Sequence, residues 1–188
     1  MTAILETIWA TVIGGMLIVS ILNGLFTIQT TAMNLEMQVT LNQISEDVTS
    51  LINDDILARV GSGVDPDSTI ILTATTNEFE FKGRLAEETA VSTIKLVQED
   101  STASGYPLKV YQDNILIMGP FWLADSLDIN YFKTDDTELS TPVTTYLDSI
   151  RYASFKMEYY RKGIDKENFE TNLKSQIVFW RYFYNMFL

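Results

Sequence analysis

Residues 1–36 read MTAILETIWATVIGGMLIVSILNGLFTIQTTAMNLE, and they carry charged side chains only at Glu6 and Glu36. The uncharged stretch between these two acids, from Thr7 to Leu35, would form a helix about 43 Å long at 1.5 Å per residue. The hydrocarbon core of a bilayer is about 30 Å thick. The stretch is therefore long enough for one membrane crossing, and its most apolar part runs from Ile8 to Phe26.

The same stretch lacks the pattern of a removable secretory signal peptide. Such a peptide needs a basic start, a short apolar core and a small-residue cleavage site. The first basic residue of this chain is Arg59. The positive-inside rule therefore has no cation to act on here, and we expect orientation to depend on other features, such as a leader already removed.

An apolar stripe continues beyond the uncharged stretch. Its residues recur at alternating spacings of four and three, which is one face of a helix: Met37, Leu41, Ile44, Val48 and Leu51. We predict one continuous helix from about Ala3 to Ala58, ended by the glycines and the Asp-Pro-Asp turn between residues 61 and 67. We expect the stripe to pack on the domain that follows.

From Ser68 onward, short runs rich in β-branched and aromatic residues predict strands bounded by turn residues. These predicted strands are Thr69–Thr75, Glu78–Lys82, Val91–Val97, Leu108–Tyr111, Ile115–Met118, Leu127–Lys133, Ser149–Arg161 and Ser175–Phe187. Asp113-Asn114 predicts a hairpin tip, and the polar residues 162–166 would join the last two strands. Antiparallel pairing is the simplest topology. We therefore predict an α+β fold in which a long helix packs on an antiparallel β-sheet head.

This pattern divides the chain into three parts. Residues 1–30 form the membrane or filament-core half of the helix, residues 31–60 its amphipathic half, and residues 61–188 the β-rich head. Residues 177–187 of the last predicted strand are too aromatic to stand exposed on both faces without promoting aggregation. We expect the helix and neighbouring strands to cover it; the alternatives are a contact between subunits or an exposed aromatic surface.

Composition excludes several classes of function. The net charge is −12, from 13 basic and 25 acidic residues, so nucleic acid is not an expected partner. Histidine and cysteine are absent, which excludes Ser-His-Asp triads, Cys-His pairs and the usual zinc ligand sets. Acidic clusters at 54–55, 87–88 and 135–138 are interpreted as solvated turns and faces. We predict no catalytic, cofactor-binding or metal site.

The N-terminus resembles that of mature type IV pilins and type II secretion pseudopilins. The resemblance lies in residues 1–6, Met-Thr-Ala-Ile-Leu-Glu, followed by a long apolar helix, an amphipathic extension and strands. In that family a glutamate occupies the fifth mature position, after a short basic leader. Here the acid is Glu6. The mature chain begins at Thr2, or the acid is shifted by one position, or Met1 is an initiator and processing differs; the sequence leaves these alternatives open.

Glycines in the helix extend the resemblance. Pilin helices often loosen near a glycine at the depth of Gly14 and Gly15, and glycine costs a helix about 1 kcal/mol. The proline usual further along is absent. Equally, Gly14, Gly15 and Gly24 fit close packing between helices in a membrane.

The head has a softer resemblance, to J-type pseudopilins and related minor pilins. It is similar in the order and spacing of four segments, which are Phe79–Gly83, Tyr106–Val110, Leu127–Phe132, and Thr141-Pro142 ahead of Ile150–Phe155.

The resemblance implies a structural subunit of an extracellular type IV pilus-like filament. It implies insertion in the inner membrane before assembly, extraction by an ATPase-driven assembly machinery, and then a homo-oligomeric helical filament at the cell surface. Glu6 would pair with the N-terminal amine of a neighbouring subunit, at Met1 or Thr2, and so set axial register. The alternatives are a minor pilin or pseudopilin that primes a short fibre, and a single-pass membrane-anchored binding domain that does not polymerise.

Overall fold

Helix α1 (Thr2–Ser50) dominates the first part of the chain. The structure is a computed structural model, and it describes residues 2–65, 67–86, 88–163 and 171–187. After α1 the helical path continues as a π-helical turn, η1 (Leu51–Ile56), and a 3-10 turn, η2 (Leu57–Arg59). The predicted helix is confirmed in extent, but the sequence pattern did not predict the change of hydrogen bonding at its end.

The helical segment ends at the predicted glycines. Gly61 and Gly63 have φ angles of 75° and 70°, a left-handed conformation that favours glycine. The Gly61 N–H donates to the Lys82 carbonyl at 2.9 Å, so the turn is attached to the sheet immediately. Pro66, the centre of the predicted Asp-Pro-Asp turn, lies outside the described residues.

Five strands form the first antiparallel sheet, in the order β1-β2-β3-β4-β5. They are β1 (Ile71–Ala74), β2 (Glu78–Gly83), β3 (Ser92–Gln98), β4 (Tyr106–Gln112) and β5 (Ile115–Leu123). Buried and half-buried side chains alternate along β2 and β3, as expected for a sheet with one face on the core. Each of the five corresponds to a predicted strand.

The predicted hairpin tip is confirmed. Asp113 and Asn114 join β4 to β5 with φ angles of 48° and 67°. Positive φ at both positions is the geometry of a type I′ turn, whose twist matches that of paired strands.

A second antiparallel sheet has the order β7-β6-β8-β9. It comprises β6 (Asp128–Phe132), the short β7 (Glu138–Leu139), β8 (Tyr152–Gly163) and β9 (Thr171–Tyr182), with the 3-10 turns η3 (Leu147–Ser149) and η4 (Tyr184–Phe187). Strand β7 was not predicted. The connection predicted at 162–166 lies outside the described residues from 164 onward.

The last strand begins and ends earlier than predicted, and it starts at Thr171. It ends at Tyr182, and residues 184–187 form η4 instead. Phe183, 2% exposed, turns into the core, and its N–H donates to the Arg151 carbonyl at 3.0 Å. Burying this ring changes the direction of the chain, and the prediction of a strand as far as Phe187 was wrong.

The core contains aromatic rings from both sheets. Phe79 of β2 lies with ring centroids 5.7 Å from Tyr131 of β6, 6.2 Å from Phe155 of β8 and 5.4 Å from Phe183. All four side chains are 2% exposed or less. The two sheets therefore share one hydrophobic core.

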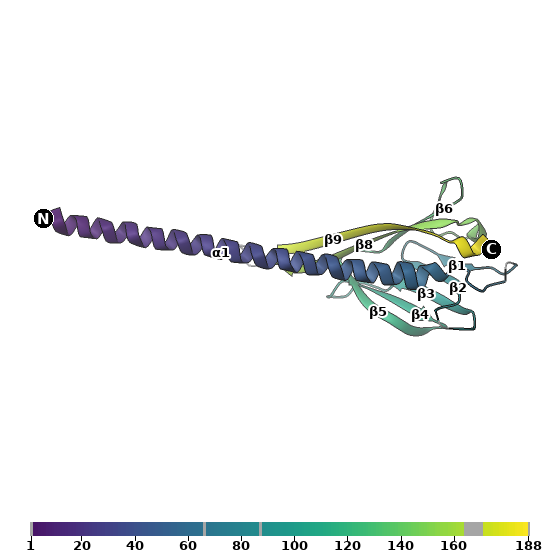
Figure 1. The fold of residues 1–188 in the computed structure, drawn as a ribbon. Coiled ribbons are helices and arrows are strands. Elements are labelled where there is room, and N and C mark those ends of the chain that lie inside the picture. The colour runs from purple at the N-terminus through teal and green to yellow at the C-terminus, as the bar shows by residue number, and fades with distance from the viewer. Residues whose placement is uncertain (1, 66, 87, 164–170, 188) are drawn as a thin grey trace. The chain divides into compact units, whose positions relative to one another are not determined.

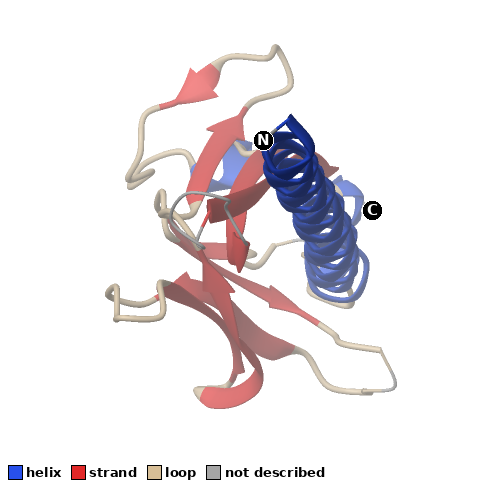
Figure 2. Cartoon of the chain, turned by 90° about the vertical axis from the view of Figure 1, so that its left-hand side faces the viewer, coloured by secondary structure: helices blue, strands red, loops and turns tan. Residues whose placement is uncertain are grey.

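The C-terminal part of the helical segment completes this core. Ile52 and Ile56 are fully buried and Leu41 is 5% exposed, so this half does pack on the head. The buried face is not quite the predicted stripe, because Ile44 of the stripe is 49% exposed while Ile52 and Ile56, outside it, are buried. The Ser45 hydroxyl lies 3.0 Å from that of Ser175, and β9 runs beside this part of the helix (Figures 1 and 2). The architecture is α+β, as predicted.

The chain divides into two compact units. One comprises residues 1–40 with 161–173, and the other residues 41–160 with 174–188. The uncharged part of α1 belongs to the first unit, whereas the core described above belongs to the second.

Candidate functional site

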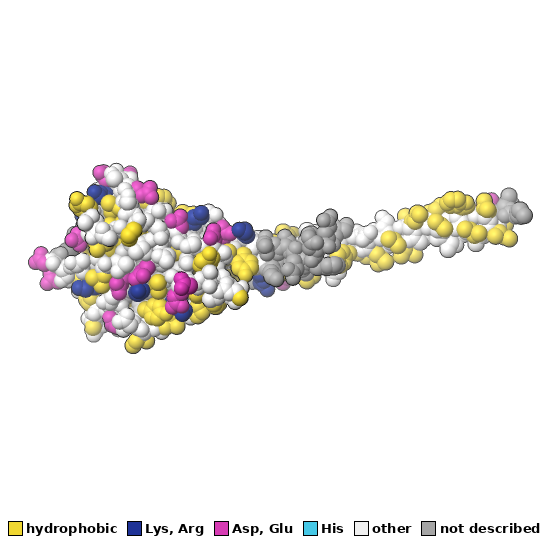
Figure 3. All heavy atoms as spheres, turned by 180° about the vertical axis from the view of Figure 1, so that it is seen from behind, with side chains coloured by type: hydrophobic (Ala, Val, Ile, Leu, Met, Phe, Trp, Pro, Cys, Tyr) yellow, Lys and Arg dark blue, Asp and Glu magenta, His cyan; other side chains and the backbone are white. Residues whose placement is uncertain are grey.

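The uncharged part of α1 exposes apolar side chains in every direction. Four consecutive residues, Met16–Val19, are each 58% exposed or more, and four residues span a full helical turn. Figure 3 shows apolar side chains along this part of the helix, whereas acidic and basic side chains are scattered over the β-rich part. A helix that is apolar all round belongs in a membrane or inside an assembly.

Length and composition allow this helix to cross a membrane. Ala3–Arg59 is the one helix in the described part of the chain that is long and apolar enough to do so. Its threonines fit that environment, because the hydroxyls of Thr7, Thr11 and Thr31 donate to backbone carbonyls four residues earlier at 2.8 Å. Hydroxyls bonded within the helix do not need water.

Glu6 is the one charged side chain of α1 ahead of Glu36. It is exposed. No cation within the described part of this chain lies within 4.0 Å of its carboxylate. Met1 lies outside the described residues, and Thr2 is described only as the first residue of the helix. The predicted pairing of Glu6 with an N-terminal amine involves a second molecule and remains a prediction.

The three glycines of α1 border open space. An ideal Cβ built on Gly14, Gly15 or Gly24 would meet no atom within 4 Å, outside the backbone of the helix itself. Packing within this chain therefore does not require glycine at these positions. A closely approaching second helix would require it, because small residues let helix backbones come together.

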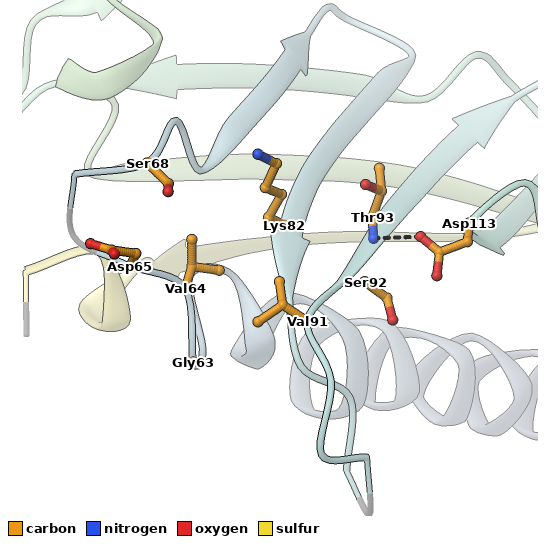
Figure 4. A pocket seen from close by; sticks show the side chains of 9 residues that line it. All are labelled: Gly63, Val64, Asp65, Ser68, Lys82, Val91, Ser92, Thr93 and Asp113. Carbon is orange, nitrogen blue, oxygen red and sulfur yellow. Dashed lines mark hydrogen bonds between the residues drawn. The ribbon is translucent and has the colours of Figure 1, made fainter.

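The head contains an open polar hollow of about 350 Å³ (Figure 4). The loop after the helix supplies Asp65 and Ser68, strand β2 supplies Lys82, and the hairpin tip supplies Asp113. Asp113 accepts the Thr93 N–H at 2.9 Å, which ties the β4–β5 hairpin to β3. This carboxylate has a structural partner, and the nine lining residues include neither histidine nor cysteine.

The acidic clusters noted in the sequence are at the surface. Asp54 accepts hydrogen bonds from Ser50 and Asn53, and Asp135 accepts the Thr137 N–H at 3.2 Å. Glu88 accepts from Gln112, whereas Glu87 lies outside the described residues. Among the described residues, no group of three or more acidic side chains converges as metal ligands would.

A second exposed feature is a cluster of aromatic rings on one face of the second sheet. The expected cover of the last strand by the helix and neighbouring strands is incomplete, because Trp180 stays 55% exposed, and the alternative of an exposed aromatic surface describes this face better. Phe132, Tyr152, Trp180 and Tyr182 contact one another there. The sequence did contain one signal for this cluster. Side chains alternate between the two faces of a strand, which puts Trp180 and Tyr182 on the opposite face from Phe179. The sequence does not show which strands lie next to one another, so it could not predict that Phe132 and Tyr152 join the cluster.

Comparison with known proteins finds no match to this chain among protein-family models, curated proteins or solved structures.

Proposed function

We propose that this protein is a structural subunit of a type IV pilin-like filament, held in the inner membrane before assembly and displayed outside the cell afterwards. One observation carries the proposal. Met16–Val19 and the residues around them expose apolar side chains on all sides, while the next half of the same helical segment buries Leu41, Ile52 and Ile56 in the head. The exposed half needs either lipid or other copies of itself.

A filament core would account for the glycines and the threonines of this half of the helix. Bundled helices would cover the apolar side chains that one chain leaves exposed. Gly14, Gly15 and Gly24 would allow close approach of neighbouring helices. The threonine hydroxyls already bond within the helix and would enter such a core without unpaired donors.

Glu6 gives the assembly its register. At the edge of the hydrocarbon its charge costs less than the roughly 2.5–3.5 kcal/mol measured for charges at the bilayer centre. In a dry helical bundle an unpaired carboxylate would be strongly destabilising. The N-terminal amine of a neighbouring subunit would be the cation that pairs with it, and correct axial stagger would then bring the two charges together.

The test replaces Glu6 with Gln, which removes the charge and keeps the shape. We expect Glu6→Gln to lower the yield of sheared surface filaments at least about tenfold, because a loss of only about 1.4 kcal/mol per subunit contact already weakens subunit association tenfold. The measurement is filament yield by electron microscopy and immunoblot, in a host that assembles the protein.

Glu36→Gln is the matched control, because it removes the next acid of the same helix outside the uncharged stretch. Its filament yield should equal that of the wild type, and both variants should still fractionate with membranes. Wild-type filament yield from Glu6→Gln would refute the proposal and favour a single-pass anchored domain that does not polymerise. A few copies per filament, counted by quantitative mass spectrometry, would instead identify a minor or priming subunit.

A further inference from the structure

Strand β9 has two chemically different faces. Residues Ser175 and Arg181 face the helix, where they contact Ser45, Asn53 and Asp54. Side chains alternate between the faces of a strand, so Val178, Trp180 and Tyr182 lie on the opposite face. These three are 49%, 55% and 48% exposed. Exposure of this size on neighbouring apolar side chains indicates an interaction surface.

We call the rings on this side of the sheet, Phe132, Tyr152, Trp180, Tyr182 and Tyr184, the outer aromatic face. Tyr152 is 5% exposed and lies at its centre, with ring centroids 5.0 Å from Phe132 and 4.6 Å from Tyr182. Its hydroxyl donates to Asp136 at 2.6 Å. These contacts fix the rings in place, so a ligand would meet a preformed platform rather than one that must order on binding.

A cavity of about 210 Å³ lies at the end of the outer aromatic face. Its lining residues are Tyr182, Phe183, Tyr184, Thr134 and Arg151. Three of these five residues are aromatic, and together the five carry three hydroxyl groups and one guanidinium. Arg151 is held by its backbone, whose N–H donates to the Phe132 carbonyl and whose carbonyl accepts from the Phe183 N–H. One guanidinium nitrogen also donates to the carbonyls of Asp148 at 2.7 Å and Ile150 at 3.3 Å. The volume suits one six-membered sugar ring, and apolar walls with a few fixed polar groups are typical of small-ligand sites.

The charges around the cavity favour a neutral ligand. Arg151 lines the cavity, and Asp136 of the β6–β7 connection accepts the Tyr152 hydroxyl of the same face. Charges of both signs therefore lie close together, and neither a cationic nor an anionic ligand is favoured overall. The whole chain carries a net charge of −12, which opposes anionic polymers further. A neutral ligand that combines an apolar face with hydrogen-bonding groups suits both the charges near the cavity and its aromatic and polar lining.

We propose that the outer aromatic face binds neutral hexopyranose glycans. One side of a pyranose ring presents C–H groups, which lie well on the negatively polarised face of an aromatic ring. Its edge carries hydroxyl groups that both donate and accept, matching Thr134, the tyrosine hydroxyls and Arg151. A sugar ring would enter the cavity while the next unit along the chain stacks toward Trp180. This inference does not require the protein to polymerise.

The test uses the full chain in a detergent that has no sugar headgroup, titrated with linear hexasaccharides of glucose, mannose and galactose in a calorimeter. We expect at least one hexasaccharide to bind. Trp180→Ala should weaken that binding about tenfold or more, and Tyr184→Ala, which changes a side chain 70% exposed, should weaken it without disturbing the fold.

Trp122→Ala is the matched control, because Trp122 is an exposed indole, 44% accessible, on β5 of the other sheet. It should bind as the wild type does. Absence of binding to all three hexasaccharides would overturn the proposal, as would equal affinity of the wild type, Trp180→Ala and Tyr184→Ala. Self-association that Trp180→Ala abolishes, with no sugar binding, would assign the face to a second copy of the chain instead.

Discussion

Glu99 follows strand β3 and accepts two hydrogen bonds, from the Lys109 ammonium at 2.6 Å and from the Tyr111 hydroxyl at 2.8 Å. These bonds favour the ionised carboxylate, the Lys109 bond most, and they hold the pKa of Glu99 below its ordinary value of 4.5. The same pair raises the pKa of Lys109. The three residues tie the start of the β3–β4 connection to β4.

This lowered pKa predicts a specific dependence of stability on pH. The contribution of Glu99 is fully present above the ordinary carboxylate pKa and is lost as pH falls through the lower folded pKa. Glu99→Gln should therefore unfold at a slightly lower temperature than the wild type at neutral pH, and the difference should shrink and disappear as the pH falls through the lowered pKa of Glu99. Thermal unfolding followed by circular dichroism measures both. Asp100→Asn, which removes a neighbouring exposed acid outside this hydrogen-bonded group, is the control variant. A difference for Glu99→Gln that persists in acid would contradict the prediction.

At the scale of elements, the junction between η2 and β2 depends on one glycine. Gly83 ends β2 and forms an isolated antiparallel bridge with Val60. A Cβ on Gly83 would overlap the backbone carbonyl oxygen of Arg59. Backbone cannot move aside as a side chain can, so the close approach of the helical segment to the first sheet requires glycine here.

Gly83→Ala should accordingly be strongly destabilising. We expect the free energy of unfolding to fall by about 3 kcal/mol, because the new methyl group would overpack against fixed backbone. The melting temperature should fall by about 10 °C for a chain of this size. Gly63→Ala is the control: its φ of 70° strains alanine, but the nearest atom lies 3.6 Å from the new Cβ. That strain costs about 1 kcal/mol. Equal melting temperatures of the two variants would show that the close approach is not rigid.

The elements that sequence could predict were those with a local cause. Apolar spacing predicted the helix, and Asp113-Asn114 predicted the hairpin. The end of β9 was mispredicted because Phe183 leaves the strand for a ring cluster assembled from other elements. Likewise β7 is two residues long and is defined only by pairing with β6. The same holds for the candidate functional residues. Glu6 and the glycines of α1 could be picked out from the sequence, whereas the outer aromatic face could not, because it depends on the order of the strands in the sheet.

At the scale of the whole molecule, apolar side chains are exposed in two different settings. Leu17 is 58% exposed in the uncharged part of α1, and Ile115 is 69% exposed at the β4–β5 hairpin. In water the two positions would be equivalent, and a lysine at either would be tolerated. In a membrane they differ, because only the helix would hold its side chain in hydrocarbon.

Leu17→Lys and Ile115→Lys therefore form a matched pair. A lysine near the centre of a spanning helix costs about 2.5–3.5 kcal/mol on insertion scales, so Leu17→Lys should lower the fraction of protein that resists alkaline extraction from membranes. Ile115→Lys should leave that fraction unchanged, because the same charge is then added to a surface that faces water. Extraction followed by immunoblot measures both. Equal retention of the two variants would mean that α1 does not lie in the bilayer, and the filament proposal would lose its membrane-held precursor.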